Sequence, residues 1–429
     1  EESRGTIDSI PNEEALKLFQ LPSCIDDRPK YKAKYTSSVL SKFTILSPTD
    51  PIRSEIQAKL FPSPNEPKPT PLPIQEKRAL ACFLGMGIGD ALGAPLEFSP
   101  VVYNKKVVTS FNHPEIWFSM ENNRFRLHPG QWTDDASMGL CLAESLLSHP
   151  NFNPRDLRTR FAAWWHFGYR NAFGYAEKSC HSVGLGGSIS MSLQEFDIKK
   201  SEYTTAGDSF TSGNGSIMRL AAVPIFYHND ISLALDIATK QSKTTHQGDE
   251  AAECCRLMTF IIITFLKCPE EMSVAEKKKK LVEEKLENEF VSSLYSVECL
   301  KKSENEGKHP SNKDLCLNDR RWDWKAKNYR YCESRAKEQP GYIGSYAMDA
   351  LAMSLHCVWN TENFRDALLK VINMCGDADT VGSITGQIAG SLYGVDEIPL
   401  DWIEAIQKWD NNGDFAHTAI KLYRNEISQ

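Results

Sequence analysis

Three glycines recur at every fourth position of an otherwise apolar stretch, and they constrain the fold of this chain more than any other feature. Gly85, Gly89 and Gly93 share one side of a helix predicted over residues 79–92, whose apolar residues recur at helical spacing. Glycine inside a helix costs roughly 1 kcal/mol relative to alanine, so a packing or functional reason is expected. The glycines leave a bare strip of backbone. We therefore expect another helix to pack very close to this one.

Apolar residues at helical spacing dominate the chain from residue 74 onwards. They predict further helices at residues 157–165, 233–238, 249–266, 347–359 and 364–372. The segment 249–266 is apolar almost all round, which is typical of a central buried helix. Strand-like alternation is limited to a weak candidate at residues 105–110. The sequence thus predicts an all-α fold.

Composition divides the chain into an extension and one domain. Residues 1–74 mix short apolar stretches with proline, serine and charged residues, and they end in a proline-rich run that predicts an extended, semi-rigid tether. The whole segment fits either a surface extension that lies on the domain or a docking tail. Residues 75–429 form the predicted domain. Within it, residues 269–340 are rich in charge, and we interpret them as an insertion with some helix. The lysine run Lys277–Lys280 fits an exposed helical face better than a nuclear signal.

Charge and cysteine content limit the partners and the compartment. The chain has 24% charged residues and a net charge of -7, which gives no general attraction to nucleic acid or to an anionic membrane. No apolar run is expected to reach membrane-spanning length; residues 80–92 come nearest but include Asp90. The cysteines are scattered without a CxxC pair, which indicates reduced thiols. We expect a monomeric, cytoplasmic protein, with the nucleus as the alternative.

Two predicted helices begin with oxygen-bearing side chains, in the motifs Thr133-Asp134-Asp135 and Gly376-Asp377-Ala378-Asp379-Thr380. Asp and Thr are ordinary N-cap residues, so either motif alone fits a cap. A cap uses one side-chain oxygen, whereas the two motifs together offer carboxylates and hydroxyls without Cys or His. This donor set is typical of Mg²⁺ or Mn²⁺ rather than zinc. Converging carboxylates also repel one another, so we interpret the motifs as two halves of one metal site.

Two glycine-rich loops and one histidine are candidate ligand-binding elements. Gly184-Leu185-Gly186-Gly187-Ser188 and Gly213-Asn214-Gly215-Ser216 each precede an apolar segment, where backbone N–H groups can approach phosphate oxygens. Neither matches a P-loop or dinucleotide fingerprint, and either alone is more often a plain turn. Thr244-Thr245-His246 is predicted to cap the helix at 249–266. His246 fits a structural role, and it also fits contact with a base or ribose.

Five motifs follow one another in a recognisable order. They are Gly89-Asp90-Ala91-Leu92-Gly93 with Glu97, Trp132-Thr133-Asp134-Asp135, Gly213-Asn214-Gly215-Ser216-Ile217-Met218-Arg219, Thr245-His246, and Gly376-Asp377-Ala378-Asp379-Thr380. Together they resemble the ADP-ribosylglycohydrolase family, which includes the dinitrogenase reductase-activating glycohydrolase. The resemblance covers residues 74–394. It implies an all-α, orthogonal multi-helix domain that uses two Mg²⁺ or Mn²⁺ ions to remove ADP-ribose from a modified acceptor.

The resemblance also implies roles for individual residues. The implied metal ligands are Thr133, Asp134, Asp135, Asp377, Asp379 and Thr380. The implied contacts to the diphosphate, ribose and adenine come from Gly186, Gly213, Asn214, Gly215 and His246. Cleavage at C1 of ribose commonly uses two carboxyl groups as acid and base, and Glu97 or Asp134 is expected to transfer the proton.

Three questions stay open at this level. The motifs resemble the arginine-directed branch of the family most, with ADP-ribosyl-serine, poly-ADP-ribose and small ADP-ribose esters as alternative substrates. An isoprenoid synthase requires an Asp-Asp-x-x-Asp motif, and Asp134-Asp135 is followed by Ala136, Ser137 and Met138 instead. A crystallin-like or non-catalytic ADP-ribose-binding scaffold would be expected to lose ligands that this chain keeps.

Overall fold

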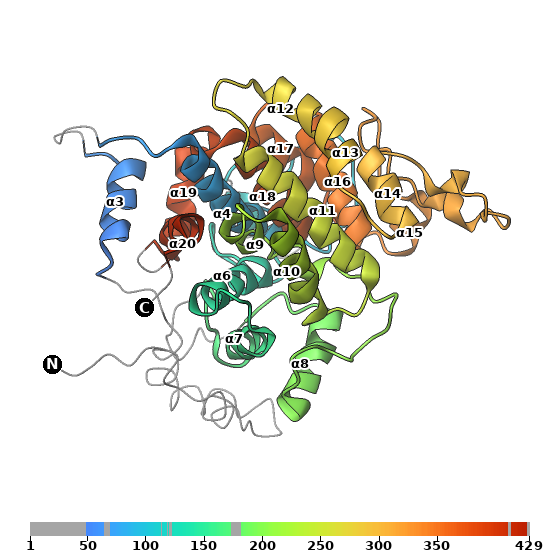
Figure 1. Cartoon of the computed structure of the whole chain (residues 1–429), viewed down its shortest axis with the longest axis horizontal. Coiled ribbons are helices and arrows are strands. Elements are labelled where there is room, and N and C mark those ends of the chain that lie inside the picture. Colours follow the sequence, from blue (N-terminus) through green and yellow to red (C-terminus); the bar gives the residue numbers. More distant parts are fainter. Residues whose placement is uncertain are drawn as a thin grey trace.

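The computed structural model describes residues 49–63, 69–112, 114–117, 119, 122–172, 182–410 and 413–426 (Figure 1). Over these ranges the backbone forms helices and irregular segments, and its β-type pairing consists of three isolated bridges. The all-α prediction is therefore confirmed. The strand candidate at residues 105–110 is wrong. The Asn373 side chain accepts the backbone N–H groups of Val107 and Val108 at 2.6 and 2.8 Å, where a neighbouring strand would otherwise accept them.

Helix α4 (Ile74–Gly93) lies near the centre of the molecule and crosses α18 (Ala378–Tyr393) at backbone contact (Figure 1). A Cβ atom built on Gly85 would lie 2.2 Å from the carbonyl oxygen of Gly386. One built on Gly89 would meet the α18 backbone at 2.1 Å. Side chains at these positions would force the helices apart. The close partner predicted for the glycine strip is thus α18.

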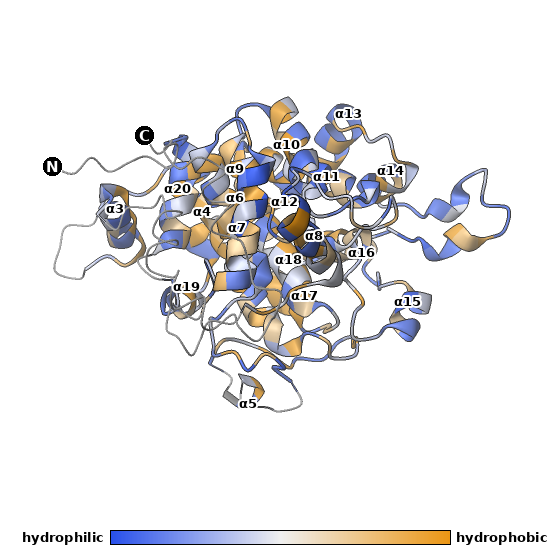
Figure 2. Ribbon diagram, turned by 90° about the horizontal axis from the view of Figure 1, so that it is seen from below, coloured by the Kyte–Doolittle hydropathy of each residue, from blue (hydrophilic) through white to orange (hydrophobic). Residues whose placement is uncertain are grey.

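The remaining helices of the core surround this pair. In chain order they are α6 (Asp134–Ser148), α7 (Pro154–Phe167), α9 (Ala222–Phe226), α10 (Ile231–Lys243), α11 (Asp249–Leu266), α16 (Ala347–Trp359), α17 (Phe364–Ile372), η8 (Val395–Glu397), α19 (Leu400–Gln407) and α20 (Asp414–Arg424). Helices α11, α16 and α17 have the bounds that their apolar periodicity predicts, because their apolar side chains join one buried cluster. Figure 2 shows hydrophobic residues on the inner helices and hydrophilic ones towards the periphery.

Helix α4 continues into the 3-10 turn η3 (Ala94–Leu96), and together they span 23 residues. By length and composition alone this segment is sufficient to cross a membrane, contrary to the expectation from sequence. Its apolar window is completely buried inside the protein. The segment therefore has the environment of a core helix, and its apolar composition follows from packing on all sides.

Part of the predicted N-terminal extension is helical and docks on the core. Helix α3 (Pro51–Leu60) lies beside α20 (Figure 1). The Arg424 guanidinium of α20 pairs with Glu55 of α3 at 3.2 Å and with Glu76 of α4 at 2.8 Å. Residues 1–48 lie outside the described residues. The boundary of the extension stays a prediction.

The predicted insertion is largely helical and packs onto the core. Its elements are α12 (Val274–Lys280), the π-helical turn η5 (Leu281–Leu286), α13 (Glu287–Glu289), α14 (Tyr295–Lys302), η6 (Glu306–Lys308), η7 (Cys316–Asp319) and α15 (Glu333–Glu338). The lysine run is not an exposed face throughout, because Lys277 and Lys278 are buried. The Lys278 ammonium donates to the carbonyl oxygen of Thr361 at 2.5 Å. This contact anchors α12 to the segment between α16 and α17. The remaining described elements are the single turn α5 (Pro114–Trp117), helix α8 (Gly187–Lys199) and the 3-10 turn η4 (Asn214–Ser216).

Candidate active site

The carboxylate of Asp90, on α4, caps the N-terminus of α6. It accepts the backbone N–H groups of Thr133 and Ala136 at 2.9 and 3.0 Å, and the Thr133 hydroxyl at 2.8 Å. Thr133 is the N-cap residue, yet its side chain makes no cap bond. Asp134 and Asp135 are buried in the first turn and are not needed for capping. This arrangement argues against a simple N-cap role for the first acidic motif.

The two acidic motifs meet in space, although they are far apart in the sequence. The Thr133 hydroxyl lies 3.4 Å from a carboxylate oxygen of Asp379. Two groups of carboxylates gather here, and within each group the oxygens lie within 4.8 Å of one another: Asp90, Asp135 and Asp379 in the first, and Glu97, Asp377 and Asp379 in the second. Asp379 belongs to both groups, so they form one continuous acidic cluster.

Burial and mutual repulsion raise the pKa values of this acidic cluster. Burial raises the pKa of Asp90 to about 7 and, together with the charge of Asp379, that of Asp377 to about 8. Burial, followed by repulsion from Asp379, raises the pKa of Asp134 and Glu97 well above the usual carboxyl range. These carboxyl groups cannot all be ionised together unless positive charge is bound among them.

The donor atoms of the cluster fit divalent cations. The buried oxygens Asp135 Oδ1 and Glu97 Oε2 have no hydrogen-bond partner among the described residues. A buried acceptor without a partner is costly, so a ligand that satisfies these atoms is expected. Their neighbours are carboxylates and the hydroxyls of Thr133 and Thr380, which are both buried. Hard oxygen donors of this kind suit Mg²⁺ or Mn²⁺.

Glu97 lies on the loop after η3, and the second acidic motif holds this loop in place. The backbone N–H of Phe98 donates to the carbonyl oxygen of Gly376 at 3.0 Å, and the N–H of Gly376 donates to Ser99 at 2.9 Å. Gly376 has a φ of +69°, a left-handed conformation that glycine adopts without strain. The paired backbones bring Glu97 beside Asp377. The two residues are far apart in the sequence, so this contact depends on the loop after η3 folding back onto the second acidic motif.

The second glycine-rich loop contacts the acidic cluster through Asn214. This residue begins the 3-10 turn η4 (Asn214–Ser216). Its side-chain amide donates to the carboxylate of Asp377 and to the carbonyl oxygen of Gly344, both at 2.9 Å. Gly213 forms an isolated bridge with Tyr346. The loop is therefore fixed between the cluster and the start of α16.

His246 lies buried behind this loop. A Cβ atom built on Gly215 would lie 3.1 Å from the His246 ring, so the ring packs against the loop backbone. Its Nδ1 atom lies 2.8 Å from the hydroxyl of Thr245. Burial, followed by the charge of Arg219, lowers the pKa of His246 to about 3. The predicted cap role of Thr244-Thr245-His246 is wrong, because α11 has Gly248 as its N-cap. Substrate contact by His246 stays a prediction.

The first glycine-rich loop reaches the acidic cluster through Gly184 rather than Gly186. A Cβ atom built on Gly184, which has a φ of +92°, would lie 2.1 Å from Asp134 Oδ1. Nothing lies within 4 Å of a Cβ atom built on Gly186, which is exposed before α8. Gly184 thus determines the room available to Asp134. The open backbone at Gly186 can still approach a ligand.

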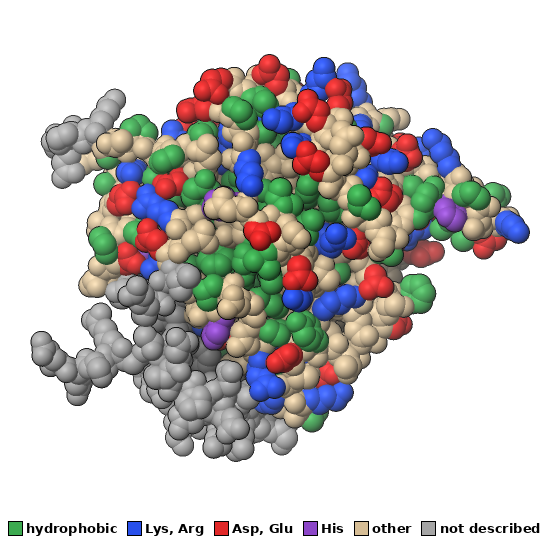
Figure 3. Space-filling view, viewed as in Figure 1, with side chains coloured by type: hydrophobic (Ala, Val, Ile, Leu, Met, Phe, Trp, Pro, Cys, Tyr) green, Lys and Arg blue, Asp and Glu red, His purple; other side chains and the backbone are tan. Residues whose placement is uncertain are grey.

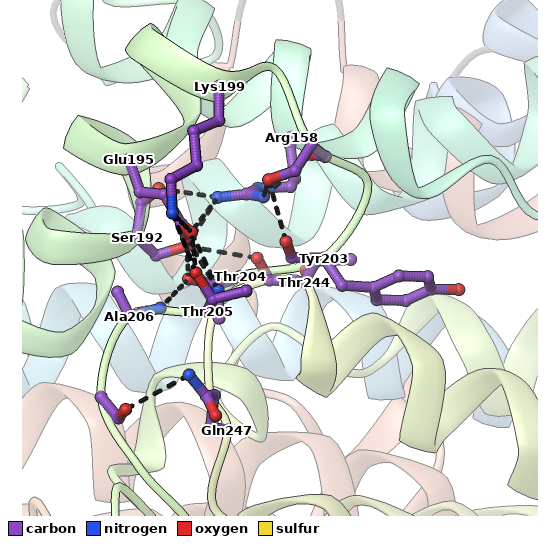
Figure 4. A network of polar contacts seen from close by, with 12 residues as sticks. Arg158, Ser192, Glu195, Lys199, Tyr203, Thr204, Thr205, Ala206, Thr244 and Gln247 are labelled. Atoms are coloured by element: carbon purple, nitrogen blue, oxygen red, sulfur yellow. Dashed lines mark hydrogen bonds and ion pairs between the residues drawn. The ribbon is translucent and has the colours of Figure 1, made fainter.

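A polar network ties α8 to the segment that precedes α11 (Figure 4). The guanidinium of Arg158, on α7, donates to the carbonyl oxygen of Ser192 at 2.7 Å. The Ser192 hydroxyl in turn donates to the carbonyl oxygen of Thr244 at 3.2 Å. Glu195 of α8 accepts the Thr204 hydroxyl at 2.6 Å. The network therefore connects α7 and α8 with the segments that contain Thr204 and Thr244.

Comparison with known proteins connects this geometry to a family. Residues 71–428 match the family model described as ADP-ribosylglycohydrolase, and the match contains both acidic motifs and both glycine-rich loops. The chain belongs to the ADP-ribosylglycohydrolase family. The resemblance seen in the sequence is confirmed, and the protein is a glycohydrolase. Membership of this family also excludes the isoprenoid synthase alternative and favours an enzyme over a crystallin-like scaffold.

Named ADP-ribosylglycohydrolases match most of the chain. The ADP-ribosylarginine hydrolase Tri1 of Pseudomonas putida (strain GB-1) is 30% identical over 329 residues, which cover 77% of this chain and 74% of that protein. The ADP-ribosyl-[dinitrogen reductase] glycohydrolase of Rhodospirillum rubrum is 22% identical, over 78% of this chain and 92% of that protein. A solved structure described as an ADP-ribosylglycohydrolase-related protein complex aligns with a TM-score of 0.58 and 28% identity, covering 83% of this chain and 100% of that one. The family's all-α fold is thus confirmed.

Two residues of this glycohydrolase cluster received no role from sequence reasoning. Asp90 joins the first carboxylate group, and Gly184 packs against Asp134. The signal for Asp90 is present in the sequence, because it is the one charged residue in the otherwise apolar stretch 79–92. Nothing in the sequence distinguishes Gly184 from Gly186, since only the folded loop shows which glycine faces the cluster.

Proposed function

We propose that this ADP-ribosylglycohydrolase removes ADP-ribose from modified arginine side chains of proteins, using two Mg²⁺ or Mn²⁺ ions. The observation that carries the proposal is the convergence of Asp379 with Thr133 and with Glu97 in one acidic cluster. Relatives named as ADP-ribosylarginine hydrolases, from Pseudomonas putida (strain GB-1) and Serratia proteamaculans (strain 568), support arginine as the acceptor.

The proposed metal ligands come from the starts of α6 and α18. They are Thr133, Asp134, Asp135, Asp377, Asp379 and Thr380. Asp90 supports the set by fixing the backbone at Thr133. Bound divalent ions would supply positive charge that balances the carboxylates and orients the ribose hydroxyls.

We assign proton transfer to Glu97 and Asp134. Hydrolysis joins a water oxygen to C1 of the ribose while the bond from C1 to the acceptor nitrogen breaks, through an oxocarbenium-like state. One carboxyl group takes a proton from the water, and one gives a proton to the departing nitrogen. Glu97 has a buried oxygen without a partner, and Asp134 lies against the Gly184 loop. Asp134 is itself one of the proposed ligands, Glu97 lies beside them, and neither carboxyl group forms a salt bridge within the described part of the chain.

The remaining predicted contacts belong to the ADP part of the substrate. The open backbone at Gly186 and the loop of Gly213, Asn214 and Gly215 are the proposed binding elements for the diphosphate and ribose. Their supporting features are the exposed backbone at Gly186 and the hydrogen bonds that fix Asn214 to Asp377 and Gly344. The described cysteines are free thiols, which supports the proposed cytoplasmic setting. The monomeric state stays a prediction.

Acceptor preference is tested with one panel of substrates. ADP-ribosyl-arginine, ADP-ribosyl-serine, poly-ADP-ribose and a small ADP-ribose ester are incubated with the protein in Mg²⁺ and in Mn²⁺, and released ADP-ribose is measured. We expect the highest kcat/KM with the arginine conjugate. Faster release from the serine conjugate or from the polymer would assign the protein to that activity instead.

The ligand set is tested by Asp379→Ala and Asp134→Asn. We expect each variant to lose turnover by at least about 100-fold, because each removes a charge beside the reacting bond. Circular dichroism should show an unchanged helix content. Asp401→Asn, an exposed aspartate on α19, is the matched control and should keep full activity. Full activity in both cluster variants would remove the cluster from the mechanism.

A further inference from the structure

A cavity whose charged lining residues are mostly cations lies apart from the acidic cluster. It has a volume of about 800 Å³ and lies between residues 103–109, residues 327–330 of the insertion, residues 356–361, and helix α17 with the residues after it. None of the proposed metal ligands lines it. Its charged lining is Lys105, Lys106, Lys327, Arg330, Arg365, Lys370 and, as the single carboxylate, Asp366.

Most of these cations have no carboxylate partner. Arg365 is the exception, with its guanidinium 3.9 Å from Asp366. Among the described residues, no carboxylate oxygen lies within 4.0 Å of the ammonium groups of Lys105, Lys106 or Lys370, nor of the other lining cations. In contrast, Figure 3 shows basic and acidic side chains intermingled over the face that it draws. Unpaired cations around one cavity are unusual for a chain with a net charge of -7.

The cavity is built from segments that are tied together. The Asn373 side chain accepts two backbone N–H groups of residues 107–108 and donates to the carbonyl oxygen of Val108 at 2.8 Å. The hydroxyl of Tyr103 accepts the backbone N–H of Tyr331 at 3.2 Å. The Arg330 guanidinium lies 4.6 Å from the centre of the Tyr103 ring. The walls are therefore preformed, and ligand binding does not have to order them.

From this geometry we propose that the cavity binds a small polyphosphorylated molecule, of the class of nucleoside triphosphates or inorganic polyphosphate. The volume lies in the range of about 300–1,000 Å³ that small-molecule sites occupy. Several cations converging on one cavity require a ligand with more than one negative charge, and phosphate oxygens accept from both Arg and Lys. A cavity of this volume favours a small ligand over a nucleic acid strand.

The cavity adjoins the candidate active site through the backbone. Residues 98–102 pair with residues 374–376, because Phe98 donates to Gly376 and Val102 donates to Met374, each at 3.0 Å. Glu97 lies at one end of this paired segment, and Tyr103 of the cavity lies at the other. A ligand in the cavity therefore holds the segment that leads to Glu97.

Calorimetry with the full chain tests this site. ATP and inorganic tripolyphosphate are titrated into chelator-treated protein, with adenosine as the uncharged comparison. We expect both phosphates to bind at one equivalent and adenosine not to bind. Equal affinities for the two phosphates indicate a polyphosphate site, and tighter ATP binding indicates a nucleotide site. Both results support the proposal.

Charge-reversal variants locate the binding. Lys105→Glu with Lys370→Glu should weaken ATP and tripolyphosphate binding at least tenfold. A second pair, Lys327→Glu with Arg330→Glu, changes exposed residues and should do the same if the first pair does not fold. The control is Lys308→Glu with Lys313→Glu, which makes the same charge change on the insertion outside the cavity and should leave binding unchanged.

Two results would overturn the site: no heat of binding with either phosphate at millimolar concentration, or the same affinity in the cavity pairs as in the control pair. The measurement needs neither divalent ions nor an ADP-ribosylated substrate. Its failure is therefore separate from a failure of the proposed hydrolase activity.

Discussion

Single uncharged residues determine the positions of the carboxylates in the acidic cluster. Gly184 leaves room for Asp134, and its left-handed backbone is strained for any other residue. Asn214 holds Asp377 by a hydrogen bond of 2.9 Å. The positions of the carboxylates therefore depend on neutral neighbours as much as on the carboxylates themselves.

Gly184→Ala should reduce turnover without removing any functional group. The new Cβ atom would lie 2.1 Å from Asp134 Oδ1, so the carboxylate or the loop has to move. A misplacement of about 1 Å near reacting groups costs about 100-fold in rate. We expect a loss of this order in kcat, measured by release of ADP-ribose. Gly413→Ala, the same change at a glycine with a φ of +72° whose Cβ atom would have nothing within 4 Å, is the matched control and should turn over normally. Equal rates in the two variants would contradict the role given to Gly184.

At the scale of elements, the crossing of α4 and α18 is the contact that brings Asp90 and Asp379 together in the first carboxylate group. Helix α4 supplies Asp90, and Asp379 lies in the first turn of α18. The glycines allow the two backbones to touch, so these helix ends have little freedom to separate. The same crossing explains why α4 is buried along nearly its whole length.

Gly386→Ala should destabilise the protein more than Gly87→Ala. A Cβ atom on Gly386 would lie 1.9 Å from the carbonyl oxygen of Gly85, where only backbone can yield. A Cβ atom on Gly87, also in the core, meets the Phe415 ring at 2.8 Å, and a side chain can shift. Overpacking of this kind costs about 1–3 kcal/mol. Urea unfolding should show a larger loss for Gly386→Ala; equal losses would mean that the crossing tolerates separation.

The sequence predicts the helices well and their contacts poorly. The helices at 249–266 and 364–372 can be predicted from their own residues, because apolar side chains that recur at helical spacing are typical of a buried helix. By contrast, the cap that Asp90 provides to α6 joins distant segments and has no local signal. The position of His246 behind the loop of Gly213 to Ser216 likewise has no local signal, because that loop comes from another part of the chain. The glycine strip predicts that some helix packs closely against it, but the sequence does not identify that helix as α18.

For the whole molecule, the acidic cluster is a source of internal repulsion within a chain that already carries a net charge of -7. Burial makes this repulsion stronger than it would be on the surface, and it raises the pKa of Asp377 to about 8. A bound cation would lower this electrostatic cost. Folding and metal binding are therefore expected to be thermodynamically coupled.

Mg²⁺ or Mn²⁺ should raise the melting temperature of the chelator-treated protein. An ion that binds only the folded state at 100 times its Kd adds about 2.7 kcal/mol to the free energy of unfolding. Differential scanning calorimetry with increasing metal measures the shift. Asp379→Ala, which removes the residue shared by both carboxylate groups, should shift much less. An equal shift in the variant would place the ions elsewhere.

The touching backbones of α4 and α18 have a practical consequence for redesign. Because these helices cannot be moved apart or exchanged singly, new acceptor preferences have to be introduced on the surrounding loops. Segments 97–112, 182–186 and 340–346 each contain a residue beside the cluster and belong to no helix. Loop grafting between related enzymes should thus transfer specificity while the central pair is kept intact.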